Sequence, residues 1–211
     1  MQNFDTNDID TYIWVYGRAL CHASARGHLK LAKVILQKIE TLLEDKWHPY
    51  DCDDWIDAAL EEAASHGHRS VVQLLHEKGA NINVYSKDGT PLVMAAAAGR
   101  GDVGEYLLEN GADVHTNDKY GYTALHKAAR VGDVKAVKAL LEYEANVDYV
   151  GDENEDRNTA LLLAVQEGHE DVVTLLLEKG ANARHVNACD ETALQLAESS
   201  GREEVARLLR E

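Results

Sequence analysis

Ten histidines, three cysteines and one glycine-rich hexapeptide are the parts of this 211-residue chain that suggest chemistry at first sight. The hexapeptide GRGDVG, residues 99–104, contains the Gly-x-Gly-x-x-Gly spacing with which dinucleotide-binding loops approach a pyrophosphate. It also contains Arg100-Gly101-Asp102, the tripeptide that cell-adhesion receptors bind. A dinucleotide loop must follow a strand and open a helix, and a receptor-binding tripeptide must stand on an extended extracellular loop.

The histidines show no spacing typical of a metal site. His28, His68 and His169 each follow a glycine at the same place in a recurring pattern, so we interpret them as residues of the fold. In His66-Gly67-His68 we expect the two rings to diverge, because the glycine between them belongs to a turn. We predict no metal site and no cofactor.

The sequence also shows no motif typical of a catalytic nucleophile or of a paired acid and base. Cys21, Cys52 and Cys189 are odd in number and widely spaced, which favours neither a disulfide framework nor zinc, and we interpret Cys21 as a buried structural thiol. No Gly-x-Ser-x-Gly elbow occurs, and the acidic residues of GDENEDR, 151–157, share one loop instead of facing each other across a pocket. We therefore predict no enzyme and no catalytic residues.

The charge balance narrows the class of partner. With 37 acidic against 21 basic residues the net charge is -16, which repels nucleic-acid backbones and anionic membranes. The N-terminal residues have no basic segment followed by an apolar one, and no apolar run approaches the roughly 20 residues that span a bilayer. We expect a monomeric intracellular protein, in the cytoplasm with the nucleus as the alternative, that binds another protein.

The positions of these residues are set by an internal repeat. Six segments superimpose on one glycine each, and these glycines are separated by 40, 32, 33, 36 and 33 residues. They are Gly27, Gly67, Gly99, Gly132, Gly168 and Gly201. Because Gly99 is one of these six and follows an alanine-rich helical segment, GRGDVG is a turn between two helices, and both the dinucleotide and the receptor interpretations fail.

The repeat resembles the ankyrin repeat. TPL at 90–92, TALH at 123–126, GANIN at 79–83 and GADVH at 111–115 all fall in register with that family's pattern. The resemblance covers almost the whole chain, from about Tyr12 onward, and implies an all-α solenoid of helix-turn-helix repeats with turn or hairpin tips. We expect one domain, 1–211, with repeats at about 10–48, 49–83, 84–115, 116–148, 149–184 and 185–211.

The helix boundaries follow from the residue types. Thr90, Thr123, Thr159 and Thr192 stand where a hydroxyl can cap the first helix of a repeat, and Pro91 suits the first helical position. Paired alanines make that helix thin, whereas valine and leucine give the second helix a wide apolar face. No repeat can bury both faces alone, so we expect stability to come from stacking.

Departures from the pattern are expected to change the local structure. Glu144 replaces a glycine that ends the second helix, and there we predict a weakened or reshaped turn. An insertion at 40–55 should extend a helix before a loop, and GDENEDR should lengthen the tip before the fifth repeat. Gly104 lies inside a helix, where it marks either close packing or a soft spot.

The resemblance implies that a protein partner binds the concave face, formed by the turn tips and the exposed side of the first helices. Tyrosine and arginine are frequent binding hot spots, and tyrosines and basic residues concentrate in the middle repeats. The candidate partner-binding residues are Tyr85, Lys87, Lys119, Tyr120, Tyr122, Arg130, Arg157 and Gln166.

A second cluster of aromatic residues lies outside the repeat pattern near the N-terminal end. Trp47, Tyr50, Trp55 and His66 form this secondary candidate surface. We favour a cap, in which the 40–55 insertion covers the first repeat, over an aromatic binding groove.

The predicted function is that of a non-enzymatic adaptor or scaffold for protein–protein interaction. The alternative is an inhibitor or immunity-type protein that blocks the active site of a target enzyme, which an acidic surface would suit if the target were basic. Fold alone does not choose between them, because specificity lies in the surface of such a scaffold.

Overall fold

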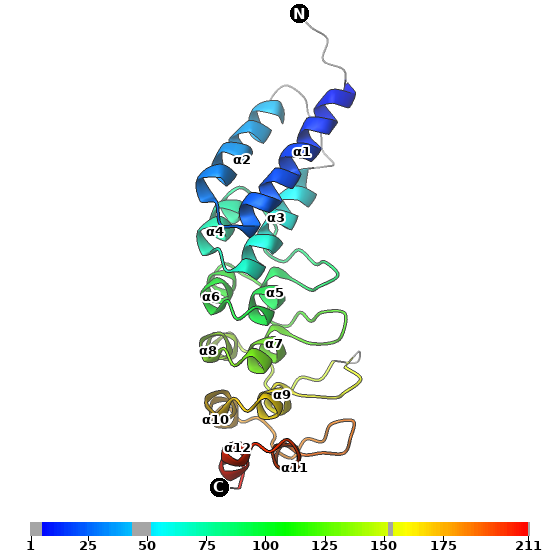
Figure 1. The fold of residues 1–211 in the computed structure, drawn as a ribbon, viewed down its shortest axis with the longest axis vertical. Helices are drawn as coiled ribbons and strands as arrows, with labels where there is room; N and C mark the ends of the chain where they lie inside the picture. Colours follow the sequence, from blue (N-terminus) through cyan, green and yellow to red (C-terminus); the bar gives the residue numbers. More distant parts are fainter. Residues whose placement is uncertain (1–5, 44–51, 152–153, 211) are drawn as a thin grey trace, which may run out of the picture.

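The computed structural model describes residues 6–43, 52–151 and 154–210. These residues form twelve α-helices, arranged as six helix-turn-helix pairs (Figure 1). In chain order they are α1 (Thr6–Ala25), α2 (Leu29–Leu43), α3 (Cys52–His66), α4 (Arg69–Glu77), α5 (Pro91–Ala97), α6 (Gly101–Glu109), α7 (Ala124–Val131), α8 (Val134–Glu142), α9 (Ala160–Glu167), α10 (Glu170–Glu178), α11 (Ala193–Ser199) and α12 (Glu203–Leu208).

The pairs stack into an elongated two-row solenoid. Odd-numbered helices form one row and even-numbered helices the other, and each helix contacts the next helix of its own row. The loops between pairs project beyond the odd-numbered row (Figure 1). Within the described residues these loops contain only the isolated bridges Ser86–Gly89 and Asn117–Thr123, so the predicted all-α repeat solenoid is confirmed.

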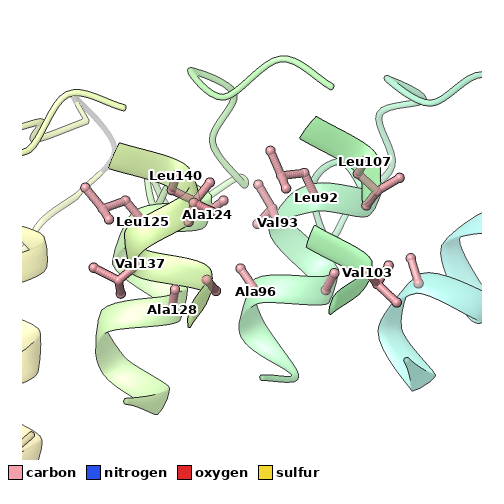
Figure 2. Close-up of a cluster of buried hydrophobic side chains, with 14 of the residues drawn as sticks. Leu92, Val93, Ala96, Val103, Leu107, Ala124, Leu125, Ala128, Val137 and Leu140 are labelled. Atoms are coloured by element: carbon pink, nitrogen blue, oxygen red, sulfur yellow. The ribbon is translucent and has the colours of Figure 1, made fainter. Parts of the chain in front are cut away.

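One continuous apolar core runs through the stack. Alanines of the odd-numbered row, such as Ala96 and Ala128, are buried, and their small side chains let neighbouring helices approach closely. Leucines and valines of both rows fill the space between pairs, as Figure 2 shows for Leu92 and Leu107 of one pair and Leu140 of the next. Each pair therefore buries its apolar faces against its neighbours.

The predicted threonine caps take two forms. Thr159 Oγ1 accepts from Leu162 N–H and Thr192 Oγ1 accepts from Gln195 N–H, both at 3.4 Å, as expected of a helix cap. Thr123 forms a capping box with His126, whose Nδ1 accepts from Thr123 N–H, whereas the hydroxyl of Thr90 lies 3.1 Å from Thr116 Oγ1. The helix starts are thus where the sequence predicts them, with different partners.

His126 is a buried part of the scaffold. Its Nδ1 accepts a hydrogen bond from Thr123 N–H at 3.2 Å, which requires the unprotonated nitrogen. Burial lowers the pKa of His126 to about 4, although the nearby backbone carbonyls of Asn158 and Tyr149 favour the protonated ring. The folded protein therefore holds this imidazole neutral.

Side chains that follow the turn glycines tie the odd-numbered row together. His68 Nε2 lies 3.1 Å from Ala25 O, and His169 Nε2 lies 3.0 Å from Arg130 O, so the interpretation of these two histidines as fold residues is confirmed. Arg100 and Arg202 make the same connection to the preceding pair. Arg100 Nε donates to Ser65 O at 3.4 Å and Arg202 Nε to Gln166 O at 3.1 Å.

The fourth repeat breaks this series. Asp133 holds the position that follows the turn glycine, and a carboxylate cannot donate to a carbonyl oxygen. Asp133 instead caps α8 by accepting from Ala136 N–H at 3.0 Å. Among the described residues, no donor from the fourth repeat reaches Ala97 O, which is the equivalent carbonyl of the third repeat.

The turn at Glu144 keeps the shape of the glycine turns. Glu144 adopts a left-handed φ of 64°, and Ala145 N–H donates to Leu140 O at 3.0 Å. Gly79 has a φ of 96°, with the equivalent hydrogen bond from Ala80 to Leu75. The predicted reshaping is therefore wrong, because the hydrogen bonds of the turn impose the conformation at a cost of roughly 1–2 kcal/mol for a residue with a Cβ.

Of the two alternatives for Gly104, the structure supports a soft spot in the helix over close packing. A Cβ built on this buried glycine would have Leu92 Cδ1, at 3.9 Å, as its nearest neighbour, which is ordinary van der Waals contact. A Cβ on Gly101 would instead lie 2.9 Å from the Asp133 carboxylate. Close packing therefore belongs to Gly101.

We expect Gly104→Ala to raise the free energy of unfolding by about 1 kcal/mol, because alanine is the better helix former and its methyl group fits. Chemical denaturation with an unchanged slope measures the difference. Gly101→Ala is the control and should give no gain, since its methyl group displaces the Asp133 cap. Equal stabilisation by both substitutions, or destabilisation by Gly104→Ala, would contradict the assignment.

His126 should make stability depend on pH between about 6.5 and 4. Below about pH 6.5 the unfolded chain binds a proton at this residue and the folded chain does not until about pH 4, so acid favours unfolding. The loss across this window is roughly 3 kcal/mol. The variant His126→Asn should lose this part of the pH dependence, because its amide oxygen can still accept from Thr123 N–H but does not titrate. Denaturation at a series of pH values measures the free energy of unfolding, and a pH dependence equal to the wild type's would contradict the assignment.

Candidate functional site

The tip of the fourth repeat is held by a buried ion pair. Lys127 Nζ on α7 lies 2.6 Å from Asp118 Oδ2, and their side chains are only 10% and 6% exposed. The other oxygen, Asp118 Oδ1, accepts from the N–H groups of Tyr120 at 2.9 Å and Tyr122 at 3.0 Å. One carboxylate thus fixes the loop backbone on both sides of Gly121.

The environment of Asp118 keeps it ionised. Burial on its own would raise the pKa of this carboxyl, but hydrogen bonds from Lys127 Nζ and from the two tyrosine N–H groups outweigh burial and lower it. The pair is therefore charged but neutral overall, and both oxygens of the Asp118 carboxylate have partners within the protein.

Tyr122 belongs to this scaffold more than to the surface. It is half-buried, its hydroxyl donates to Asp156 Oδ2 at 3.3 Å, and its ring lies 4.9 Å from Lys127 Nζ. Burial raises the pKa of the Tyr122 phenol, and Asp156 adds to this effect. The contact joins the fourth tip to the fifth, so removing this ring would disturb the fold as well as any binding surface.

Tyr85 and Tyr120 are the exposed aromatic residues of neighbouring tips. Their exposed fractions are 58% and 56%, and Lys119 Nζ lies 4.9 Å from the centre of the Tyr120 ring. Within the described part of the chain, no carboxylate lies within 4 Å of the cationic groups of Lys87, Lys119 or Arg130. The third and fourth repeats of this acidic chain therefore carry exposed rings and cations that have no carboxylate partner among the described residues.

A groove of about 350 Å³ separates the third and fourth repeats on this face. Its lining comes from α3, α5, α7 and two tips, namely Ser65, Lys87, Asp88, Met94, Ala97, Ala98, Asp118, Tyr120 and Lys127. Of the predicted partner-binding residues, Lys87 and Tyr120 line it directly, and Lys119 adjoins Tyr120.

Arg157 and Gln166 lie one repeat further along the stack. Arg157 is exposed with a left-handed φ of 53°, and its carbonyl lies 2.8 Å from His185 Nε2. The carbonyl of Gln166 binds Arg202, and its side chain is exposed on α9. Both face outward, but neither lines the groove.

The secondary surface divides into three parts. Trp47 and Tyr50 lie outside the described residues, and so does most of the insertion beyond the end of α2 at Leu43. Trp55 is half-buried against Gly17 of α1, whose missing side chain makes room for the indole. The position of Trp55 between two helices fits packing between the first two repeats.

The histidines at the first turn are closer to parallel than the sequence suggests. The rings of His66 and His68 lie 6.3 Å apart at an interplanar angle of 8°, so the prediction that they diverge is wrong. Each ring is oriented by its own backbone contact, His66 by Glu62 O and His68 by Ala25 O. In residues 6–43, 52–151 and 154–210 no three potential ligands gather as a metal site would require.

Sequence reasoning missed the ion pair and the groove. A local signal existed for the pair, because Lys127 stands five residues before its turn glycine, where the third, fifth and sixth repeats have Met94, Leu163 and Leu196; the first two repeats have His22 and Glu62 there. A lysine in an apolar position predicts a buried carboxylate nearby. The groove has no comparable signal, because its walls come from segments that only stacking brings together.

Comparison with known proteins agrees with this architecture. A family model described as "Ankyrin repeats (3 copies)" matches residues 60–150 and 148–211, and one described as "Ankyrin repeats (many copies)" matches 20–76. These helical pairs with projecting tips define a protein–protein interaction module. The chain belongs to the ankyrin repeat family.

Three relatives illustrate its range. The chain is 32% identical to a putative ankyrin repeat protein of Rickettsia bellii over 73% of its own length and 86% of the relative's. It is 31% identical to the probable 26S proteasome regulatory subunit p28 of Saccharomyces cerevisiae, over 67% of the chain and 64% of p28. It is 33% identical to a Caenorhabditis elegans homologue of transient receptor potential cation channel subfamily A member 1, over 61% of the chain but only 10% of that much longer protein.

Membership of the ankyrin repeat family indicates protein–protein interaction, but it does not identify the partner. Within the described residues no helix is both long and apolar enough to cross a membrane.

Lys127→Met should destabilise the protein by about 3 kcal/mol, because it leaves the buried Asp118 carboxylate without its cation. Methionine fits the site, since Met94 holds the same position in the third repeat. The double variant Asp118→Asn/Lys127→Met should recover much of this loss. Denaturation of both single variants and the double variant measures the coupling, and strictly additive losses would show that the pair contributes nothing.

Proposed function

We propose that this chain is a non-enzymatic adaptor that holds a protein partner on its tip face. The tip face comprises the loops that follow the C-caps of the even-numbered helices, at 79–90, 111–123, 144–151, 154–159 and 180–192, with the exposed side of the odd-numbered helices. The observation that carries the proposal is the exposure of Tyr85 and Tyr120 near cations that have no carboxylate partner among the described residues. Solvent-exposed tyrosines of this kind bring a large contact area to an interface.

Pre-organisation of the fourth tip supports the proposal. Because Asp118 binds the backbone on both sides of Gly121, the segment that carries Tyr120 is ordered before any partner arrives. A loop that is already ordered loses less conformational entropy on binding. Tyr120 can therefore contribute more affinity than an equally exposed tyrosine on a flexible loop.

One relative supports an adaptor over an inhibitor. The p28 protein is described as a probable regulatory subunit of the 26S proteasome, which is a role for a protein-binding surface. We take the same role for this chain, with a partner of its own. An enzyme partner whose turnover falls in proportion to the bound fraction would instead identify an inhibitor.

We expect Tyr85→Ala and Tyr120→Ala each to weaken partner binding by about 2 kcal/mol, or roughly thirtyfold, if the rings are hot spots. Immobilised wild type captures partners from a lysate of the source cell, and titration of the recovered partner measures each affinity. Tyr143→Ala is the matched control, because Tyr143 is 43% exposed but ends α8 in the other row. Equal capture by all variants would refute the tip face as the binding surface.

The same variants separate binding from folding. Both tip rings are more than half exposed, so their removal should leave the free energy of unfolding within about 0.5 kcal/mol of the wild type's. Tyr122 is unsuitable for this test, since its hydroxyl and ring both contact the scaffold.

A further inference from the structure

We propose that the groove between the third and fourth repeats is an anchoring subsite for one bulky apolar side chain of the partner, with a carboxylate next to that side chain. The inference rests on the proposed function, because it assigns a chemistry to part of the tip face. It names a recognition element that a partner must carry.

The shape of the groove comes from small side chains on α5. Ala97 and Ala98 precede the turn glycine of the third repeat, where the next repeat has Arg130 and Val131. The missing side-chain volume leaves a hollow of about 350 Å³ between Lys87 and Tyr120, at the lower end of the range for small-ligand pockets. Such a space suits one large side chain and is too small for a whole helix.

The lining is apolar where an occupant would rest. Met94, Ala97 and Ala98 supply thioether and methyl surface, and methionine adapts its shape to what it contacts. The charges of Lys127 and Asp118 are directed at each other at 2.6 Å. The ion pair therefore completes the wall without demanding a charged ligand.

The charges around the groove are unevenly distributed. Lys87 lines it, and Lys119 flanks Tyr120, with no carboxylate within 4 Å of either amine in the described part of the chain. Arg130, three residues after Lys127 on α7, is exposed on the same side. Asp88 opposes these cations from the third tip, so a partner carboxylate is favoured on the side of the fourth repeat.

One residue of the groove lining also has a backbone carbonyl that differs from those at the other seams. Among the described residues, no side chain of the fourth repeat donates to Ala97 O, because Asp133 stands where the other linked repeats have histidine or arginine. In the equivalent places Ala25 O and Ser65 O are already engaged by His68 and Arg100. An N–H of the partner can therefore bind here and not at those seams.

The test uses a displayed library of random 12-residue peptides, panned against the full chain. Enriched peptides should share an aromatic or large aliphatic residue next to aspartate or glutamate. Binding of the enriched peptides, measured by fluorescence polarisation, should weaken at least tenfold in Ala97→Gln, which fills the groove. It should weaken severalfold in Lys119→Gln and should fall as salt rises, because the carboxylate contact is partly screened.

Two controls keep the outcome interpretable. Arg130 and Gln166 occupy the position of Ala97 in the next two repeats, so Ala97→Gln should fold, and its thermal unfolding checks this. Ser199→Gln adds a side chain at the same position of the sixth repeat and should leave peptide binding unchanged.

The results distinguish this inference from the proposed function. Peptides that lose affinity in Tyr120→Ala but bind Ala97→Gln as well as wild type would overturn the groove and leave the tip face intact. Peptides whose affinity is unchanged by both substitutions would overturn both the groove and the tip face. Enrichment of peptides without an apolar residue beside an acidic one, or of none at all, also overturns the anchoring subsite.

Discussion

Burial of apolar side chains between neighbouring helical pairs is the interaction on which every other feature of this protein depends. Leu92 and Leu107 of the third pair and Leu125 and Leu140 of the fourth are almost fully enclosed, and their enclosure requires the adjoining pair (Figure 2). Small residues such as Ala128 allow the close approach. Stacking then sets the spacing of the tips, since each loop leaves one pair and enters the next.

With the stack in place, polar contacts decide how neighbouring repeats differ. Most seams are closed by a side chain that reaches the carbonyl of the preceding repeat, as His169 does to Arg130. The seam between the third and fourth repeats has Asp133 instead and is hollowed on the tip face. At this seam the buried pair of Asp118 and Lys127 holds the backbone of the fourth tip in place. A local change in bonding thus gives one seam a distinct surface.

Local errors in sequence interpretation have physical causes. A rule about single residues predicted a reshaped turn at Glu144, yet the surrounding hydrogen bonds hold the left-handed conformation. The rings of His66 and His68 were expected to diverge, but each follows a different backbone carbonyl and they lie nearly parallel. For Gly104 the sequence left two alternatives open, because the space around a missing side chain depends on another helix.

The sequence by itself determined the repeat, the helix boundaries and the fold class, since glycine spacing, threonine caps and apolar periodicity act over a few residues. It also identified exposed candidates such as Tyr85 and Tyr120 from their positions in the tips. Only the tertiary structure decided that Tyr122 supports the scaffold, that Lys127 is neutralised by Asp118, and that Ala97 lies in a groove. The contact of Tyr122 with Asp156 and the walls of the groove come from segments that stacking brings together. The ion pair forms where the fourth tip folds back onto α7, and Lys127 is its only local signal in the sequence.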